Sequence, residues 1–94
     1  MRIITKREIN LFVEKHADSK ESLNEWYLKT KIREWASFMR IKETFNSVDY
    51  VGNDLYVFNI SDRLIARIFF QKHIVYIRFI GTHAEYDKLD LNKL

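Results

Sequence analysis

Four side chains in the second half of the chain are of types that could bind and cleave a phosphodiester. Arg63, Arg67 and Arg78 fall in segments that alternate apolar and polar residues, and His83 follows the last of these segments. A guanidinium stays protonated in proteins, so it can bind two phosphate oxygens and stabilise the charge that builds up as phosphorus becomes pentavalent. Removing one such donor typically slows a reaction by about a hundredfold or more. These residues predict a phosphate-binding surface.

His83 is the candidate for proton transfer, because imidazole exchanges protons readily near neutral pH. RNA carries its own nucleophile, the 2′-hydroxyl, so a base, a cation cluster and an acid for the 5′ oxygen would suffice without a metal. Tyr86 falls on the same side as His83 if the segment is helical, where it could stack on a base or position the phosphate. Which group is the base and which the acid stays open. As an alternative, Thr82-His83-Ala84-Glu85 is a capping box that starts a terminal turn and leaves the imidazole merely exposed.

The first half of the chain has the residue spacing of helices. The sequence from Thr5 to Glu8 fits a capping box and predicts a first helix over about 6 to 17. A second helix begins at Asp18 or Ser19, and a third, shorter one lies within 35 to 45. Apolar and aromatic residues recur every three to four positions here, so we expect them to form the core.

From Val48 onward the period changes to two, which is typical of strands. Turn signals separate three strands over about 55–60, 64–70 and 74–80. Connections of two or three residues permit only antiparallel hairpins. We therefore expect one α+β domain, with N-terminal helices packed on one face of a small antiparallel sheet. Its expected parts are a helical part from about 5 to 45, a sheet from about 48 to 81 and a C-terminal segment over 82–94.

Alternation assigns the two faces of this sheet. One apolar set should pack against the helices: Tyr56, Phe58, Ile60, Leu64, Ala66, Ile68, Phe70, Val75, Ile77 and Phe79. The opposite, outer face then receives Val57, Asn59, Arg63, Ile65, Arg67, Tyr76 and Arg78. A slip by one residue would bury three guanidinium groups, so we expect the arginines to lie together on the outer face. A face made polar only for solubility is the alternative.

The composition indicates a folded, mildly basic protein without cysteine. The 94 residues carry a net charge of +3, and the lack of cysteine excludes disulfides and favours a reducing compartment. The three histidines are widely spaced, so we expect no metal site and no cofactor. The N-terminus does not resemble a signal peptide, and no apolar run approaches the ~20 residues that cross a bilayer. We expect a cytoplasmic protein with no membrane partner.

Cations cluster in two stretches of the chain. Residues 28–42 carry five cations and one anion, and residues 59–83 carry four cations and one anion. Such clusters attract polyanions, although a solvated helix face explains a charge run equally well. If the partner is RNA, the candidates for contacts to its backbone are Asn59, Arg67, Lys29, Lys31, Arg33, Arg40, Lys42 and Lys88.

Four segments, VFNI (57–60), RLIA (63–66), VYIR (75–78) and THAEYDK (82–88), resemble the HigB family of bacterial toxins within the RelE-like superfamily. The opening RIIT, a tryptophan-bearing helical region and FNSVDYVG extend the resemblance over most of the chain, and T-H-x-E-Y-D is its most specific element. The resemblance implies a metal-independent endoribonuclease that cleaves mRNA on the translating ribosome. It also implies a HigA-like helix-turn-helix antitoxin, so that DNA would be met only indirectly, through the antitoxin.

The resemblance also implies roles for particular side chains. The strand arginines of the family's active-site face correspond to Arg63 and Arg78. Its terminal motif corresponds to His83 and Tyr86, and the asparagine of its VFN element corresponds to Asn59. Arg67 joins them by sheet geometry alone. Relatives usually have a longer turn before the RLI strand, whereas only Ser61-Asp62 intervenes here. A second class of function stays open: a non-catalytic RNA- or protein-binding module that uses the same basic face for docking.

Overall fold

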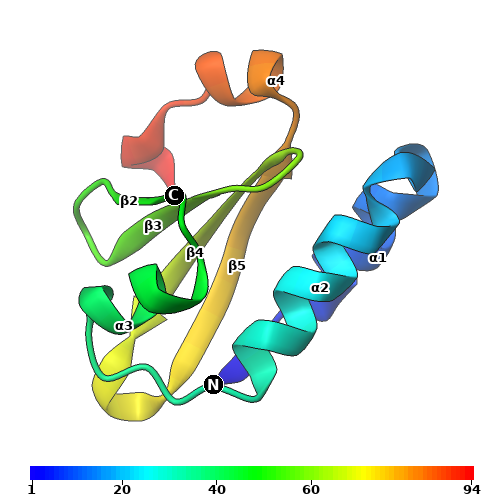
Figure 1. The fold of residues 1–94 in the computed structure, drawn as a ribbon. Coiled ribbons are helices and arrows are strands. Elements are labelled where there is room, and N and C mark those ends of the chain that lie inside the picture. The colour runs from blue at the N-terminus through cyan, green and yellow to red at the C-terminus, as the bar shows by residue number, and fades with distance from the viewer.

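The computed structural model describes residues 1–94 and has helices covering one face of a five-stranded sheet (Figure 1). The helices are α1 (Lys6–Lys15), α2 (Lys20–Lys31), α3 (Phe38–Thr44) and α4 (His83–Asp87). None of them has the length and apolar character needed to cross a membrane. The strands are β1 (Arg2–Ile4), β2 (Val48–Tyr50), β3 (Leu55–Asn59), β4 (Arg63–Phe69) and β5 (Ile74–Gly81). The predicted α+β class is confirmed.

The sheet is mixed rather than wholly antiparallel. Its strand order is β1-β5-β4-β3-β2, and the pairs from β2 to β5 are antiparallel hairpins. However, β1 pairs in parallel with β5, with Ile3 opposite Val75. The hairpin argument constrains only strands that follow one another closely, so it could not orient a strand separated from the others by three helices. Strand β2, at the other edge, was not predicted as a separate strand.

The main core lies between the helices and the helix-side face of the sheet. Phe58 is fully buried there, and its ring lies 5.5 Å from that of Trp26, 6.3 Å from Trp35 and 5.4 Å from Phe45. Burial of one large apolar side chain contributes about 1.5–3 kcal/mol. The aromatic residues of the first half are therefore core residues, as their spacing predicts.

A β-bulge in the middle of β5 changes which side chains face the helices. Ile65 is opposite Phe79, whereas the next residue, Ala66, is opposite Ile77, so Arg78 is the extra residue. One inserted residue reverses the alternation beyond it. Phe79 consequently joins the outer-face cluster and Ile80 packs on the helix side. The prediction that Phe79 faces the helices is wrong for this reason.

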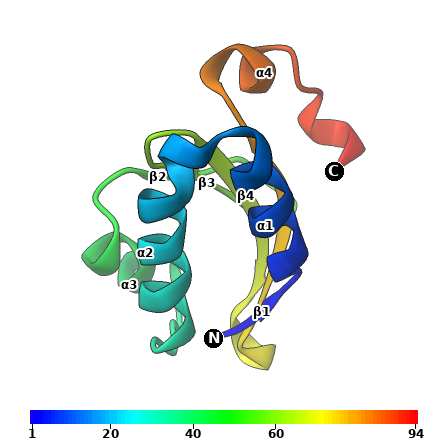
Figure 2. The same ribbon diagram turned by 90° about the vertical axis from the view of Figure 1, so that its right-hand side faces the viewer.

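The outer face of the sheet is partly covered by the C-terminal segment, residues 82–94. Three of its apolar side chains, Leu55, Val57 and Ile65, are at most 2% exposed. The residues packed against them come mainly from this segment, which lies across the sheet from α2 and α3 (Figure 2): Tyr86, Leu89, Leu91 and Leu94, together with Val51 and Phe79. The arginines are therefore placed around an apolar patch and not on an open polar surface.

The two predicted capping boxes have different outcomes. At α1, the Thr5 side chain makes no capping hydrogen bond, and only its carbonyl oxygen accepts from the Glu8 N–H (3.1 Å), so that prediction is wrong. At α4, the Thr82 hydroxyl accepts from the Glu85 N–H (3.2 Å), while the Glu85 carboxylate accepts from the Thr82 N–H (2.9 Å). The bond from the Thr82 N–H to the carboxylate is the main cause that lowers the pKa of Glu85, and both bonds fix the first turn that carries His83.

Candidate active site on the outer sheet face

Arg63 and His83 meet at the end of the sheet where β5 leads into α4. Arg63 begins β4 opposite Gly81, the last residue of β5, and His83 is the first residue of α4. The Arg63 Nη2 lies 3.1 Å from the His83 Nδ1. A guanidinium can only donate, so Nδ1 accepts this hydrogen bond and the neutral ring carries its proton on Nε2. The structure thus brings a guanidinium, of a type that can bind phosphate, into direct contact with an imidazole, of a type that can transfer a proton.

Tyr86 is the third residue of this group. The Arg63 guanidinium carbon lies 5.9 Å from the centre of the Tyr86 ring, within the range of a cation–π contact. Tyr86 is half-buried and also packs on the apolar patch of the outer face. It therefore links the Arg63–His83 pair to the C-terminal segment. The two candidate residues of the terminal motif, His83 and Tyr86, thus both lie next to Arg63.

Gly81 makes the close turn between β5 and α4 possible. A Cβ atom at this position would lie 2.4 Å from the Phe79 Cζ and 3.2 Å from the Glu85 Cβ. The first distance is too short for any real contact, so a larger residue would displace the Phe79 ring or the turn. The absence of a side chain at Gly81 thus lets the Phe79 ring pack against the end of β5, next to the turn that carries His83.

Arg67 and Arg78 belong to a second group further along the sheet. They line a cleft of ≈ 170 Å³ with Phe69 and Tyr76. The Arg67 Nε donates to the Asn53 carbonyl (3.2 Å) and its Nη2 donates to the main-chain oxygen of Leu94 (3.0 Å). Arg67 follows Arg63 by four residue steps along the strand, a span of about 13 Å. The arginines share the outer face as predicted, but in two groups rather than one.

Asn59 lies opposite Arg63 in the β3–β4 pair, but its amide is engaged at the sheet edge. Its Nδ2 donates to the Ser47 hydroxyl (2.9 Å) and to the Asp49 carboxylate (3.2 Å). These bonds hold β2 against β3. In this arrangement Asn59 contributes to the shape of the sheet edge next to Arg63.

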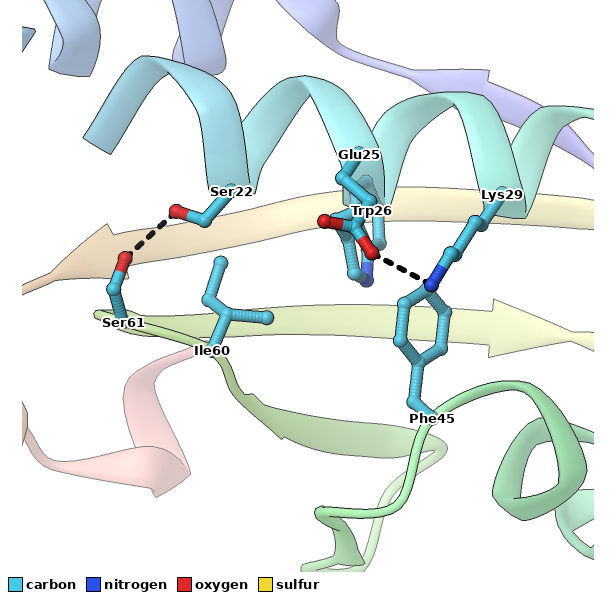
Figure 3. A pocket seen from close by; sticks show the side chains of 7 residues that line it. All are labelled: Ser22, Glu25, Trp26, Lys29, Phe45, Ile60 and Ser61. Carbon is cyan, nitrogen blue, oxygen red and sulfur yellow. Dashed lines mark hydrogen bonds and ion pairs between the residues drawn. The ribbon is translucent and has the colours of Figure 1, made fainter. Parts of the chain in front are cut away.

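The predicted RNA-contacting cations of the first half lie on the helix side, away from His83. Lys29 forms an ion pair with Glu25 (Figure 3), in which the charged atoms lie 2.6 Å apart, and Arg40 pairs with Glu43 at 3.1 Å. Two more lie near aromatic rings, Lys31 near Tyr27 (5.8 Å) and Lys42 near Phe38 (5.1 Å), and Arg33 lines a cleft with Arg40. Lys88, by contrast, is exposed directly after α4. The structure does not bring the helix-side cations to the Arg63–His83 pair.

The short turn between β3 and β4 is docked on the helix layer. The Ser61 hydroxyl lies 2.7 Å from that of Ser22 (Figure 3), and the Asp62 carboxylate accepts a hydrogen bond from the buried Ser19. Arg63 follows this turn directly, so the contacts fix the start of the strand that carries it. Sequence reasoning missed these polar partners, because pairing between distant serines leaves no periodic signal.

The fold and the two arginine groups define a small α+β protein with a basic, partly covered sheet face. A family model matches residues 19–89, and it describes the HigB toxin, the RelE-like toxic component of a toxin–antitoxin system. The chain belongs to this HigB toxin family, as its motifs predict. Membership implies an antitoxin partner. A comparison with curated proteins found no match.

Proposed function

We propose that this toxin is an endoribonuclease that cleaves mRNA at a phosphodiester bound by Arg63. The observation that carries the proposal is the 3.1 Å contact between the Arg63 guanidinium and the His83 imidazole. A cation that binds phosphate and a group that moves a proton are the two requirements for cleavage through the ribose 2′-hydroxyl. Membership of a family of toxic proteins supports an activity of this kind.

In the proposed reaction the 2′ oxygen bonds to phosphorus and the bond from phosphorus to the 5′ oxygen breaks. His83 Nδ1 accepts the 2′-hydroxyl proton, and Arg63 stabilises the pentavalent intermediate. In the free protein Arg63 occupies Nδ1. A phosphate that takes over the guanidinium therefore releases Nδ1 next to the atom that must be deprotonated. The products are a 2′,3′-cyclic phosphate and a free 5′-hydroxyl.

The leaving 5′ oxygen needs a proton, which Tyr86 or water supplies. The Tyr86 ring lies on the same guanidinium as His83. In Tyr86→Phe the ring and its packing remain while the phenol is lost. A large fall in cleavage by this variant identifies the phenol as the acid, and unchanged cleavage assigns the step to water. No metal is needed in this scheme, and the chain nowhere gathers three or more His, Cys, Asp or Glu side chains that could hold a metal ion.

The proposed setting of this reaction is the translating ribosome in the cytoplasm. Lys31, Arg33 and Lys42 are exposed on the helix side, and Lys88 is exposed beside α4. We assign them electrostatic contacts to the backbone of mRNA or ribosomal RNA, which depend on salt but not on sequence. The antitoxin partner is proposed to be a HigA-like helix-turn-helix protein, through which alone the toxin would approach DNA.

Induced expression in a bacterial host tests the proposal. We expect growth arrest and mRNA fragments with 2′,3′-cyclic phosphate ends, and we expect His83→Ala and Arg63→Ala to abolish both while the protein stays folded. His73→Asn is the matched control, since His73 is exposed at a hairpin tip with a φ of 55°, which asparagine tolerates. Intact mRNA on expression of the folded wild type would contradict the proposal and favour a docking module.

A further inference from the structure

The cleft between Arg67, Phe69, Tyr76 and Arg78 has an unusual combination of walls. The rings of Phe69 and Tyr76 lie 6.0 Å apart with their planes at 86°. Two perpendicular rings form a corner, in which a flat molecule can lie on one ring with its edge against the other. Both rings are half-buried, so a part of each is accessible.

The walls and rim of the cleft are strongly basic. Arg67 is held in place by its two main-chain acceptors, Asn53 and Leu94. Arg78 is exposed at the bulge, and the Lys72 ammonium lies 5.8 Å from the centre of the Phe69 ring. None of the four lining residues is acidic. The ligand that fits a fixed aromatic corner with cations around it is planar and carries negative charge.

We propose that this cleft is a nucleotide subsite that binds one base of single-stranded RNA, with the base on the Tyr76–Phe69 corner and its phosphate on Arg78. Base–aromatic stacking is the general means by which proteins hold unpaired nucleotides, because every base has a π-face. The ≈ 170 Å³ volume of the cleft matches one base rather than a longer segment. Phe69 and Tyr76, whose pattern in the sequence predicts no role, would form the stacking surface.

The spacing of the two arginine groups indicates where the subsite lies relative to the cleaved position of the RNA. Arg63 and Arg67 are about 13 Å apart along β4, a distance that requires more than one nucleotide. The pair formed by Ile65 and Phe79 lies between them on the same face. This step rests on the proposed function: a strand cleaved at Arg63 would place a neighbouring base, and not the base at the cut, in the cleft. The subsite would then hold the nucleotide that flanks the cleavage position and so fix which phosphate meets Arg63.

Photocrosslinking of the His83→Ala protein tests the subsite without cleavage. A set of short RNAs, each with one 5-iodouridine at a different position, is irradiated with the full chain, and the crosslinked residue is identified by mass spectrometry. We expect attachment to Tyr76 or Phe69, because iodouracil reacts with an aromatic ring on which it stacks. Attachment spread evenly over the tyrosines of the chain would overturn the proposal.

Affinity measurements on matched variants give a second readout. Tyr76→Ala is expected to weaken binding of the same RNAs by about tenfold or more, as loss of one stacked base does, whereas Tyr76→Phe retains the ring and the affinity. Tyr50→Ala is the control, since Tyr50 is 51% exposed on the edge strand, outside the cleft. Unchanged affinity in Tyr76→Ala would remove the subsite.

The outcomes separate the subsite from the nuclease. If the wild type and Tyr76→Ala both arrest growth and cut mRNA at the same positions, the nuclease proposal is supported and the subsite proposal is wrong. If RNA crosslinks to Tyr76 but the protein cuts no mRNA, the subsite proposal is supported and the nuclease proposal is wrong. If Tyr76→Ala binds RNA normally but loses its antitoxin partner, the cleft is a protein-docking surface and the subsite is wrong.

Discussion

The two faces of the sheet are built in different ways. The helix side is a continuous apolar core in which Trp26, Trp35 and Phe58 are at most 2% exposed. The outer face has only a small buried patch, and its charged groups are held around that patch by a few contacts each, such as those of Arg63 with His83 and Tyr86. The helix side therefore determines most of the stability of the fold, whereas exposed residues of the outer face can change at little cost, and it is there that we propose the chemistry.

Of the changes that test this difference between the faces, truncation of Phe58 should have the largest effect on the free energy of unfolding. Phe58→Ala removes a ring that contacts three other aromatic rings, and such a loss costs about 3–5 kcal/mol of unfolding free energy. Chemical denaturation measures it directly. His83→Ala is the matching change on the outer face, where an exposed side chain typically contributes less than about 0.5 kcal/mol. Equal losses in the two variants would contradict the division between the faces.

Replacement of Arg63 by lysine should affect activity alone. Lysine keeps the positive charge but cannot bind two phosphate oxygens in the planar geometry of a guanidinium, so we expect mRNA cleavage to fall by about a hundredfold. The denaturation midpoint should stay close to that of the wild type. Arg40→Lys, on the helix side and paired with Glu43, is the control and should cleave normally. A normal rate in Arg63→Lys would mean that charge alone suffices at this position.

The smallest expected effect concerns the pH dependence of α4. Hydrogen bonds from the Thr82 main chain and hydroxyl lower the pKa of Glu85 below its ordinary 4.5. A lowered folded-state pKa means that the stabilisation is complete above pH 4.5 and is lost as the pH falls through the folded value. We expect the α4 amides to exchange faster below that value. In the Thr82→Ala variant, amide exchange should be about fivefold faster already at neutral pH, which corresponds to the typical loss of stability for an N-cap residue. An NMR titration of the wild type that finds no shift of the Thr82 amide would argue against the coupling between this amide and the Glu85 carboxylate.

Local patterns predicted most of the fold because its hairpins and helices are short-range features. Alternation correctly placed Arg63 and Arg67 on the outer face, and the terminal motif correctly pointed to His83 as a neighbour of a strand arginine. The parallel pairing of β1 could not be predicted, since three helices separate it from the other strands. The bulge at Arg78 has no local signal either, because an uninterrupted strand fits the same residues.

The covered outer face, in contrast, had a signal that went unused. Leu89, Leu91 and Leu94 are closely spaced apolar residues in an otherwise polar tail, which indicates that the tail packs on something. Their contact with the apolar patch explains why Leu55, Val57 and Ile65 are buried on the face that was expected to be open. The separation of Arg63 from Arg67 follows from their spacing along β4, whereas the position of Arg78 depends on the bulge, which is a tertiary feature.

The single extra residue in β5 also marks where this strand can change its length during evolution. Because Arg78 stands outside the pairing, Ile77 faces the helices and Phe79 faces outward with or without it. Deletion of Arg78 would leave a regular strand in which these faces are unchanged, so the turn into the terminal helix would keep its orientation and its imidazole would stay beside the guanidinium. Loss of one residue is therefore tolerated at this point, whereas the same change elsewhere in the strand would turn the side chains beyond it to the reverse side.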